Sequence, residues 1–199
     1  TASSSTVLYG DNTWAAAGSG LTHIKTITAS SSSDITFLDG TSDVVLDATY
    51  DTYLFIATKI TLSSDDDAVR VSFSIDEGSN YDSQTYRATE AIYVDTSGTA
   101  AHQTDGEASA GATTIMGAAG NGSSEGQYFQ MYLYNPASTT VKKSAYYISN
   151  EELHNSLFRL NYGLISIAET AGALDGVRFD CNAGDFTTGD FRLYGITNG

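Results

Sequence analysis

The amino-acid sequence predicts an all-β fold: a single antiparallel β-sandwich, jelly-roll-like, preceded by an extended N-terminal arm. One proline and nineteen glycines, with little of the periodicity that helices show, argue against helical structure. Val, Ile, Thr, Tyr and Phe instead gather in about ten short runs, many of which alternate apolar with polar residues. Turn-forming pairs such as Asp39-Gly40 and Asn135-Pro136 separate these runs.

The clearest strand is AVRVSFSI, residues 68–75, which alternates as a half-buried antiparallel strand does. The residues of its apolar face are Val69, Val71, Phe73 and Ile75. The other expected strands are residues 21–28, 33–38, 53–60, 86–94, 127–134, 141–148, 158–165, 176–181 and 189–196.

Two of these expected strands carry apolar or aromatic residues in unusual positions. In QYFQMYLY, residues 127–134, Phe129, Met131 and Leu133 share one face, and the opposite face is rich in tyrosine. That second face therefore carries both apolar ring surface and polar groups, unlike an ordinary solvent-exposed face. In FRLNYGLI, residues 158–165, one face consists of Phe158, Leu160, Tyr162 and Leu164.

A chain of 199 residues has room for one domain and a terminal arm. We expect residues 1–20 to form the arm and residues 21–199 to form the sandwich. Residues 100–126 are rich in Gly, Ala and Ser and lack alternation, which predicts a long projecting loop with a small apolar latch at Ile115 and Met116. Thr1 is small enough to follow a removed initiator Met, so we expect a complete short protein.

The charge balance excludes two classes of partner. Nine Lys and Arg against 24 Asp and Glu give a formal net charge of -15, which repels nucleic acid and anionic lipid surfaces. No apolar stretch is long enough for a membrane span, and no secretory signal peptide precedes the domain. We therefore expect no nucleic-acid partner and no membrane partner.

No sequence motif points to catalysis, a cofactor or a metal ion. The histidines lie far apart, and neither a nucleophile elbow nor a phosphate-binding loop is present. Cys181 ends an alternating segment, where a free cysteine is usually a small buried hydrophobe. The sequence therefore predicts a protein that is not an enzyme and that has no catalytic residues and no cofactor.

Two acidic stretches leave a calcium alternative open. Asp76, Asn80 and Asp82 supply the oxygen donors that calcium prefers, although the same residues suit a plain hairpin turn, which we favour. The cluster at residues 65–67 predicts a solvated strand entry.

The aromatic residues suggest two kinds of partner surface. Thirteen tyrosines and one tryptophan suit either a sugar-binding surface or the rims of a subunit interface, of which the second is more common. One segment is locally both basic and aromatic, and we expect it to be a recognition surface: Lys142, Lys143, Tyr146 and Tyr147.

Two segments resemble proteins of bacteriophage particles. The opening VLYGDNTWAAAG, residues 7–18, resembles the L-x-G-D-G-T-W segment of phage tail fibres and related virion appendages, with Asn12 in place of the usual Gly. The rest of the chain is similar to β-sandwich proteins encoded in the structural regions of phage genomes. The ending G-x-F-x-L-Y-G-I, residues 189–196, is the most characteristic piece.

The resemblance implies a non-enzymatic structural protein at the virion surface, commonly a homotrimer in contact with other virion proteins. A chain with one domain favours a capsid decoration or head-fibre protein, with a tail-fibre module recognising a host surface glycan as the alternative. An arm with one large aromatic residue can anchor itself on another subunit. The residues expected to anchor it are Val7, Leu8, Tyr9 and Trp14.

Overall fold

The computed structural model describes residues 6–8, 14–16, 20–81, 85–94, 97–109, 111–153, 157–167 and 172–197. The strands are β1 (Thr6–Leu8), β2 (Trp14–Ala16), β3 (Leu21–Ser32), β4 (Asp34–Leu38), β5 (Thr52–Leu62), β6 (Asp67–Ser74), β7 (Thr85–Val94), β8 (Ala100–Ser109), β9 (Thr113–Ala119), β10 (Gln127–Tyr134), β11 (Lys143–Glu152), β12 (Phe158–Ile167), β13 (Gly176–Cys181) and β14 (Phe186–Ile196). Each of the expected strands is present, and the described residues contain no helix able to cross a membrane.

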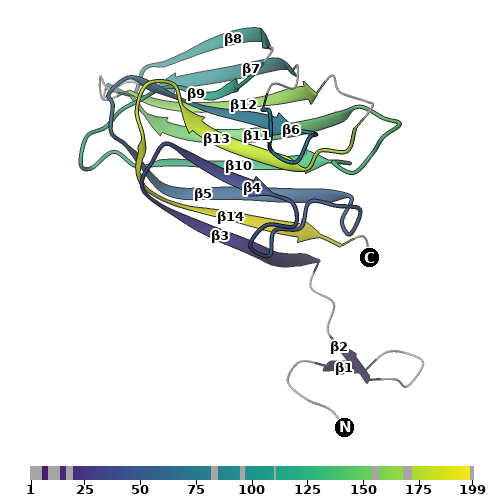
Figure 1. Cartoon of the computed structure of the whole chain (residues 1–199). Coiled ribbons are helices and arrows are strands. Elements are labelled where there is room, and N and C mark those ends of the chain that lie inside the picture. The colour runs from purple at the N-terminus through teal and green to yellow at the C-terminus, as the bar shows by residue number, and fades with distance from the viewer. Residues whose placement is uncertain are drawn as a thin grey trace.

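Two antiparallel sheets pack in layers, which confirms the all-β, jelly-roll-like sandwich (Figure 1). The large sheet has eight strands in the order β3-β14-β5-β10-β11-β12-β7-β8, and the small sheet has four in the order β4-β13-β6-β9. Strands adjacent in a sheet are mostly distant in sequence, because the chain crosses repeatedly between the layers. The small sheet covers only one face of the large sheet.

The core lies between the two sheets and is centred on aromatic rings. Phe179 of β13 meets Phe55 and Phe129 of the large sheet at ring-centroid distances of 5.7 and 4.8 Å. Phe129 belongs to the apolar face expected for β10, and that face is buried as predicted. Edge-to-face and tilted rings of this kind add to the stabilisation that the buried area supplies.

The sequence predicted that residues 65–67 form a solvent-exposed start of a strand, and this is wrong for Asp67. The Asp67 side chain is buried and accepts hydrogen bonds from the backbone N–H groups of Ala183 and Gly184, at 3.1 and 2.8 Å. It also accepts one from the N–H of Ala68 at 2.8 Å. The carboxylate therefore joins the start of β6 to the loop between β13 and β14.

The expectation of a long projecting loop over residues 100–126 is wrong. Most of that segment forms β8 and β9, and β8 pairs with β7 in an unbroken antiparallel register. A strand at a sheet edge needs backbone partners more than an alternating apolar face, so small residues suffice there. Ile115 and Met116, the expected apolar latch, are both buried. Two adjacent residues can both point inward there because the pairing of β9 with β6 shifts register opposite Val69.

The inner face of β11 and β12 is partly polar. Arg159 donates to the Glu151 carboxylate directly across the strand pair, and both side chains are buried. Asn161 donates to Glu151 at 2.7 Å and to Ser149 at 3.1 Å, and Ser149 donates to the carbonyl of Ile115 on β9 at 2.7 Å. Since these polar groups point inward, the alternating neighbours of Arg159 and Asn161 on β12 must point outward.

Replacing Asp67 tests the role of its buried carboxylate. Asp67→Ala leaves the N–H groups of Ala183 and Gly184 without their acceptor, so we expect a loss of about 2–3 kcal/mol in the free energy of unfolding. Asp65, two residues earlier and exposed, gives the matched control Asp65→Ala, which should change stability by less than about 0.5 kcal/mol. Urea denaturation of the three proteins measures both values, and equal stabilities would contradict the assignment.

Candidate functional site

The outer face of the large sheet, the face turned away from the small sheet, carries most of the exposed large apolar side chains. They are Leu21, Ile92, Tyr128, Phe158 and Leu164, with exposed fractions of 42, 36, 46, 49 and 59%. They come from β3, β10, β12 and β7, which lie between one edge of the sheet and the strand next to the other edge. Single exposed apolar residues are normal on a protein surface, whereas a contiguous set marks a contact site.

The strand register places outward side chains in rows across the sheet. Tyr132 of β10 lies opposite Tyr146 of β11, and Tyr146 lies opposite Leu164 of β12. On the other side of β10, Tyr132 lies opposite Leu54 of β5. The next row contains Gln130, Ile148 and Tyr162. Cross-strand neighbours on one face are about 5 Å apart, so these rows are continuous.

Tyrosines dominate the middle of this face. The rings of Tyr132 and Tyr134 stack on β10 with centroids 6.4 Å apart and an interplanar angle of 9°. Partial burial, together with the neighbouring phenols of Tyr132 and Tyr146, raises the pKa of Tyr134 above its ordinary value. The Tyr134 hydroxyl therefore stays protonated around neutral pH and can both donate and accept hydrogen bonds.

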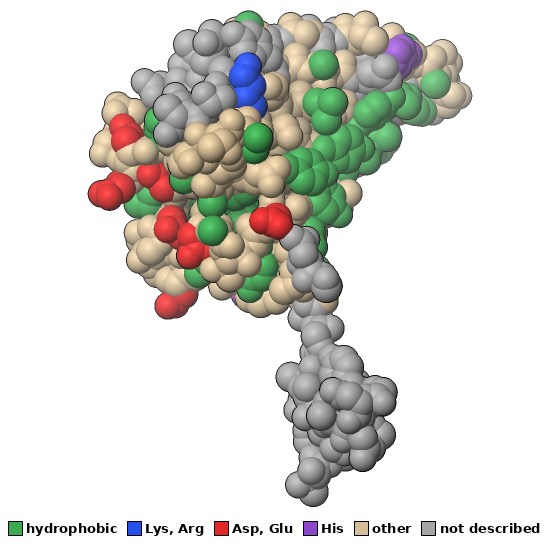
Figure 2. Space-filling model, turned by 90° about the vertical axis from the view of Figure 1, so that its right-hand side faces the viewer, with side chains coloured by type: hydrophobic (Ala, Val, Ile, Leu, Met, Phe, Trp, Pro, Cys, Tyr) green, Lys and Arg blue, Asp and Glu red, His purple; other side chains and the backbone are tan. Residues whose placement is uncertain are grey.

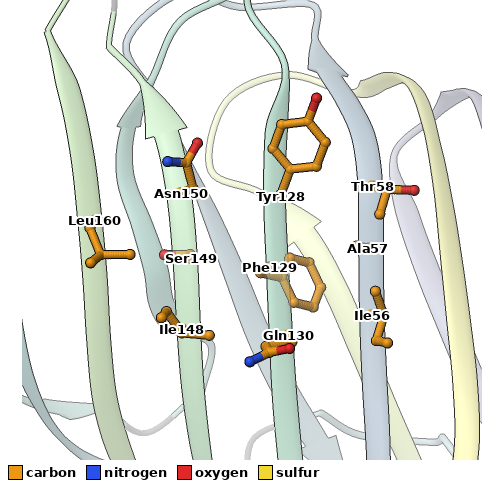
Figure 3. Close-up of a pocket in the computed structure, with 10 residues that line it drawn as sticks. All are labelled: Ile56, Ala57, Thr58, Tyr128, Phe129, Gln130, Ile148, Ser149, Asn150 and Leu160. Atoms are coloured by element: carbon orange, nitrogen blue, oxygen red, sulfur yellow. The ribbon is translucent and has the colours of Figure 1, made fainter.

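Two shallow hollows interrupt the face. The first has a volume of about 280 Å³, and Figure 3 shows how β5, β10, β11 and β12 lie side by side there. Its outward lining includes Ile56, Tyr128, Gln130, Ile148 and Leu160. The second hollow has a volume of about 440 Å³. Its lining includes Ala88, Thr104, Tyr146, Tyr162 and Leu164.

Charged residues are few at the centre of the face and lie on the strands that flank it, where the register places Glu90 of β7 opposite Tyr162. Along β10, β11 and β12 the one charged outward position is Glu152, at the end of β11. On β14, Asp190 pairs with Arg192 at 3.0 Å and with Lys59 at 3.6 Å. Figure 2 shows a band of hydrophobic side chains on one side of the molecule, with most of the acidic side chains in view on the other side.

The structure divides the expected recognition residues between the two faces of β11, which corrects that prediction. Lys143 and Tyr147 are buried: the Lys143 ammonium donates to the carbonyl of Gly172, and the Tyr147 hydroxyl is hydrogen-bonded to the hydroxyl of Thr89. Lys142 is exposed just before the strand, and Tyr146 is half-buried on the outer face. Strand alternation separates neighbouring residues in this way.

Three of the four expected anchoring residues lie in described strands, of which the structure describes the backbone pairing alone. Val7 and Leu8 lie in β1 and Trp14 lies in β2, and these strands pair antiparallel with Leu8 opposite Trp14. Tyr9 is not among the described residues, and neither are the side chains of β1 and β2. The arm therefore includes a short hairpin, and its anchoring role stays a prediction.

The acidic turn after β6 uses its oxygen atoms internally. Asp76 accepts hydrogen bonds from the backbone and side-chain nitrogens of Asn80, at 2.9 and 2.6 Å, and one from the Ser74 hydroxyl at 3.0 Å. The bonds from Asn80 lower the pKa of the Asp76 carboxyl. Asp82 lies outside the described residues, and within the described ones no group of three or more His, Cys, Asp or Glu side chains is arranged to hold a metal ion.

Sequence reasoning missed the outer face as a single surface. It found the tyrosine-rich side of β10 and the grouping of Phe158, Leu160, Tyr162 and Leu164, and the structure confirms both sets. It did not identify Leu54, Ile56 and Ile148 as their neighbours, because strand order cannot be derived from one strand at a time. The usable signal was the presence of apolar residues on both faces of the same strands.

Comparisons with known proteins identify no relative that assigns a function. No protein-family model matches the chain, and no curated protein matches it. A family 7 alginate lyase in complex with its substrate is a weak structural neighbour, with a TM-score of 0.23 and 9% sequence identity over 100% of this chain and 85% of that one. A likeness at this level carries no argument about activity.

The cysteine offers a test of the core. Cys181 is buried, as expected, and burial, with Asp67 and Asp180 nearby, raises the pKa of its thiol to about 12. Because the thiolate is the reactive form, we expect a disulfide reagent at pH 8 to label the native protein at least ~100-fold more slowly than the urea-unfolded protein. Rapid stoichiometric labelling of the native chain would contradict the buried position.

Proposed function

We propose that the chain is a non-enzymatic structural protein of a bacteriophage virion, displayed on the particle as a capsid decoration or head-fibre protein and held there by residues 1–20. The observation that carries this proposal is the outer face of the large sheet: broad, tyrosine-rich and nearly uncharged at its centre. Surfaces enriched in tyrosine and depleted of charge are typical of protein contacts. The two segments that resemble virion proteins supply the setting.

The chemistry of the outer face supports contact over catalysis. General acid–base and nucleophilic mechanisms need titratable groups that converge with shifted pKa values. The polar groups that point outward along β10, β11 and β12 are phenols, hydroxyls and amides, apart from Glu152. Such groups can bind and orient a partner, and the shallow hollows between them can receive protruding side chains of that partner.

The position of the arm supports the attachment role. Residues 1–20 lead directly into β3, which forms one edge of the large sheet. A segment at a sheet edge can reach a neighbouring protein without disturbing the core. One large aromatic residue inserted into a pocket of another protein often contributes much of the binding energy of such a contact.

Truncation of the arm tests the attachment. We expect a chain that begins at Leu21 to fold but to lose co-sedimentation with particles depleted of this protein, and Trp14→Ala in the full chain should weaken binding by about 30-fold. Trp14→Phe, which keeps an aromatic ring, is the matched control and should retain more of the affinity. If the truncated chain binds particles as well as the full chain, the anchoring role is wrong. If a particle reconstruction places the protein on the tail, the capsid location is wrong and the tail location takes its place.

A second candidate function, glycan recognition by a tail-fibre module, is favoured by the hollow between Tyr146, Tyr162 and Leu164. Aromatic rings beside a shallow hollow can stack on the apolar face of a sugar ring.

A glycan array probes this candidate directly. If it holds, the protein binds defined glycans, and Tyr162→Ala weakens that binding at least ~10-fold through the loss of ring contact. Tyr194→Ala removes a tyrosine from the same face several strands away and should leave glycan binding unchanged. Absence of binding across the array, or equal losses in both variants, would remove the hollow as a sugar site.

A further inference from the structure

We propose that the outer face of the large sheet is the contact surface between copies of this chain. The proposal goes beyond the virion role and does not depend on it, because it concerns the purified protein alone. It rests on three features of the face: its size, its charge, and the kind of polar groups that it presents.

The outer face, with its charged margin included, is large enough for a stable contact. Eight strands about 4.8 Å apart span about 34 Å, and the six steps from Phe158 to Leu164 span about 20 Å, which gives a projected area of about 700 Å². Protruding side chains make the accessible area larger than the projected one. A standard protein–protein contact buries about 800 Å² on each partner, so the face reaches the required size.

The distribution of charge selects the partner. Two copies, each with a formal net charge of -15, repel each other unless they meet where the acidic groups are few. The centre of the outer face is such a place, since Glu152 alone is charged among the outward positions of β10, β11 and β12. A basic partner would find few carboxylates at the centre to pair with, whereas a second acidic copy meets little repulsion there.

The polar groups of the face are self-complementary. A phenol hydroxyl or an amide both donates and accepts hydrogen bonds, so two identical surfaces built from them can satisfy each other. On this face such groups come from Tyr132, Tyr146, Tyr162, Gln130 and Asn150. The charged cluster of Asp190, Arg192 and Lys59 lies at the margin, as in the polar rim of ordinary interfaces.

Light scattering coupled to size exclusion measures the prediction on the full chain. We expect a mass of twice 21.0 kDa, because a contact between identical faces pairs two copies. Ile92→Glu and Leu164→Glu, on the outer face, should each raise the dissociation constant by at least ~100-fold, because a carboxylate introduced into a contact between identical faces is repeated on the other copy.

Ile75 supplies a matched control. It is 38% exposed, against 36% for Ile92, and it follows β6 of the small sheet, in the other layer of the sandwich. Ile75→Glu therefore makes the same chemical change at the same exposure and should leave the mass unchanged. Far-ultraviolet circular dichroism of each variant shows whether it has kept its fold.

A readout without mutation guards against variants that fail to fold. In hydroxyl-radical footprinting of the wild-type chain, Tyr128, Tyr162 and Leu164 should be protected at high protein concentration and modified on dilution. A monomeric mass at high concentration would overturn the proposal, as would a multimer that both outer-face variants leave intact. Glycan binding by a wild-type monomer would assign the face to a sugar instead. Loss of particle attachment on arm truncation is measured separately and decides only the virion role.

Discussion

A two-layer sandwich covers one face of each sheet and leaves the other face to the surroundings, and the rest of this structure depends on that constraint. The large sheet packs Phe55, Phe129 and Phe191 against Phe179 of the small sheet, and this aromatic cluster fixes which face is inside. The strands of the large sheet nevertheless carry apolar residues on both faces. What the small sheet does not cover must meet either water or another molecule.

The balance between the two faces is set by polar groups on the inside. Glu151, Arg159 and Asn161 occupy inward positions where a simple sandwich would have aliphatic residues, and they satisfy one another across β11 and β12. Burying charges in this way is costly unless they are paired and hydrogen-bonded, as they are here. Their presence explains why Phe158 and Leu160 are outside, and so why the outer face is apolar.

The sequence allowed the fold class and each alternating strand to be predicted, because period-two patterning depends only on local residues. It did not allow β8 to be predicted, since an edge strand of small residues carries no alternating signal. The orientation of β12 was also beyond reach: alternation separates Phe158 from Arg159, but the side that faces the core depends on what Glu151 offers across the strand. The same limit misplaced Lys143 and Tyr147, which are buried, while Tyr146 lies on the other side of the strand and Lys142 is exposed just before it.

In the first half of β12 the polar side chains point inward and the apolar side chains point outward. This arrangement bears on how the chain finds its native strand pairing. A slip of one residue relative to β11 would turn Phe158 and Leu160 toward the interior and Arg159 toward water, an exchange that hydrophobicity favours in the first half of the strand. The same slip would turn the buried Ile165 and Ile167 outward in the second half. In the first half of the strand the correct register is therefore held by the matched carboxylate, guanidinium and amide, which lose their partners in the slipped arrangement, and in the second half by the burial of Ile165 and Ile167. The pairing register of β11 with the first half of β12 is therefore specified by hydrogen bonds between polar side chains. Hydrophobic collapse alone would favour the wrong register there.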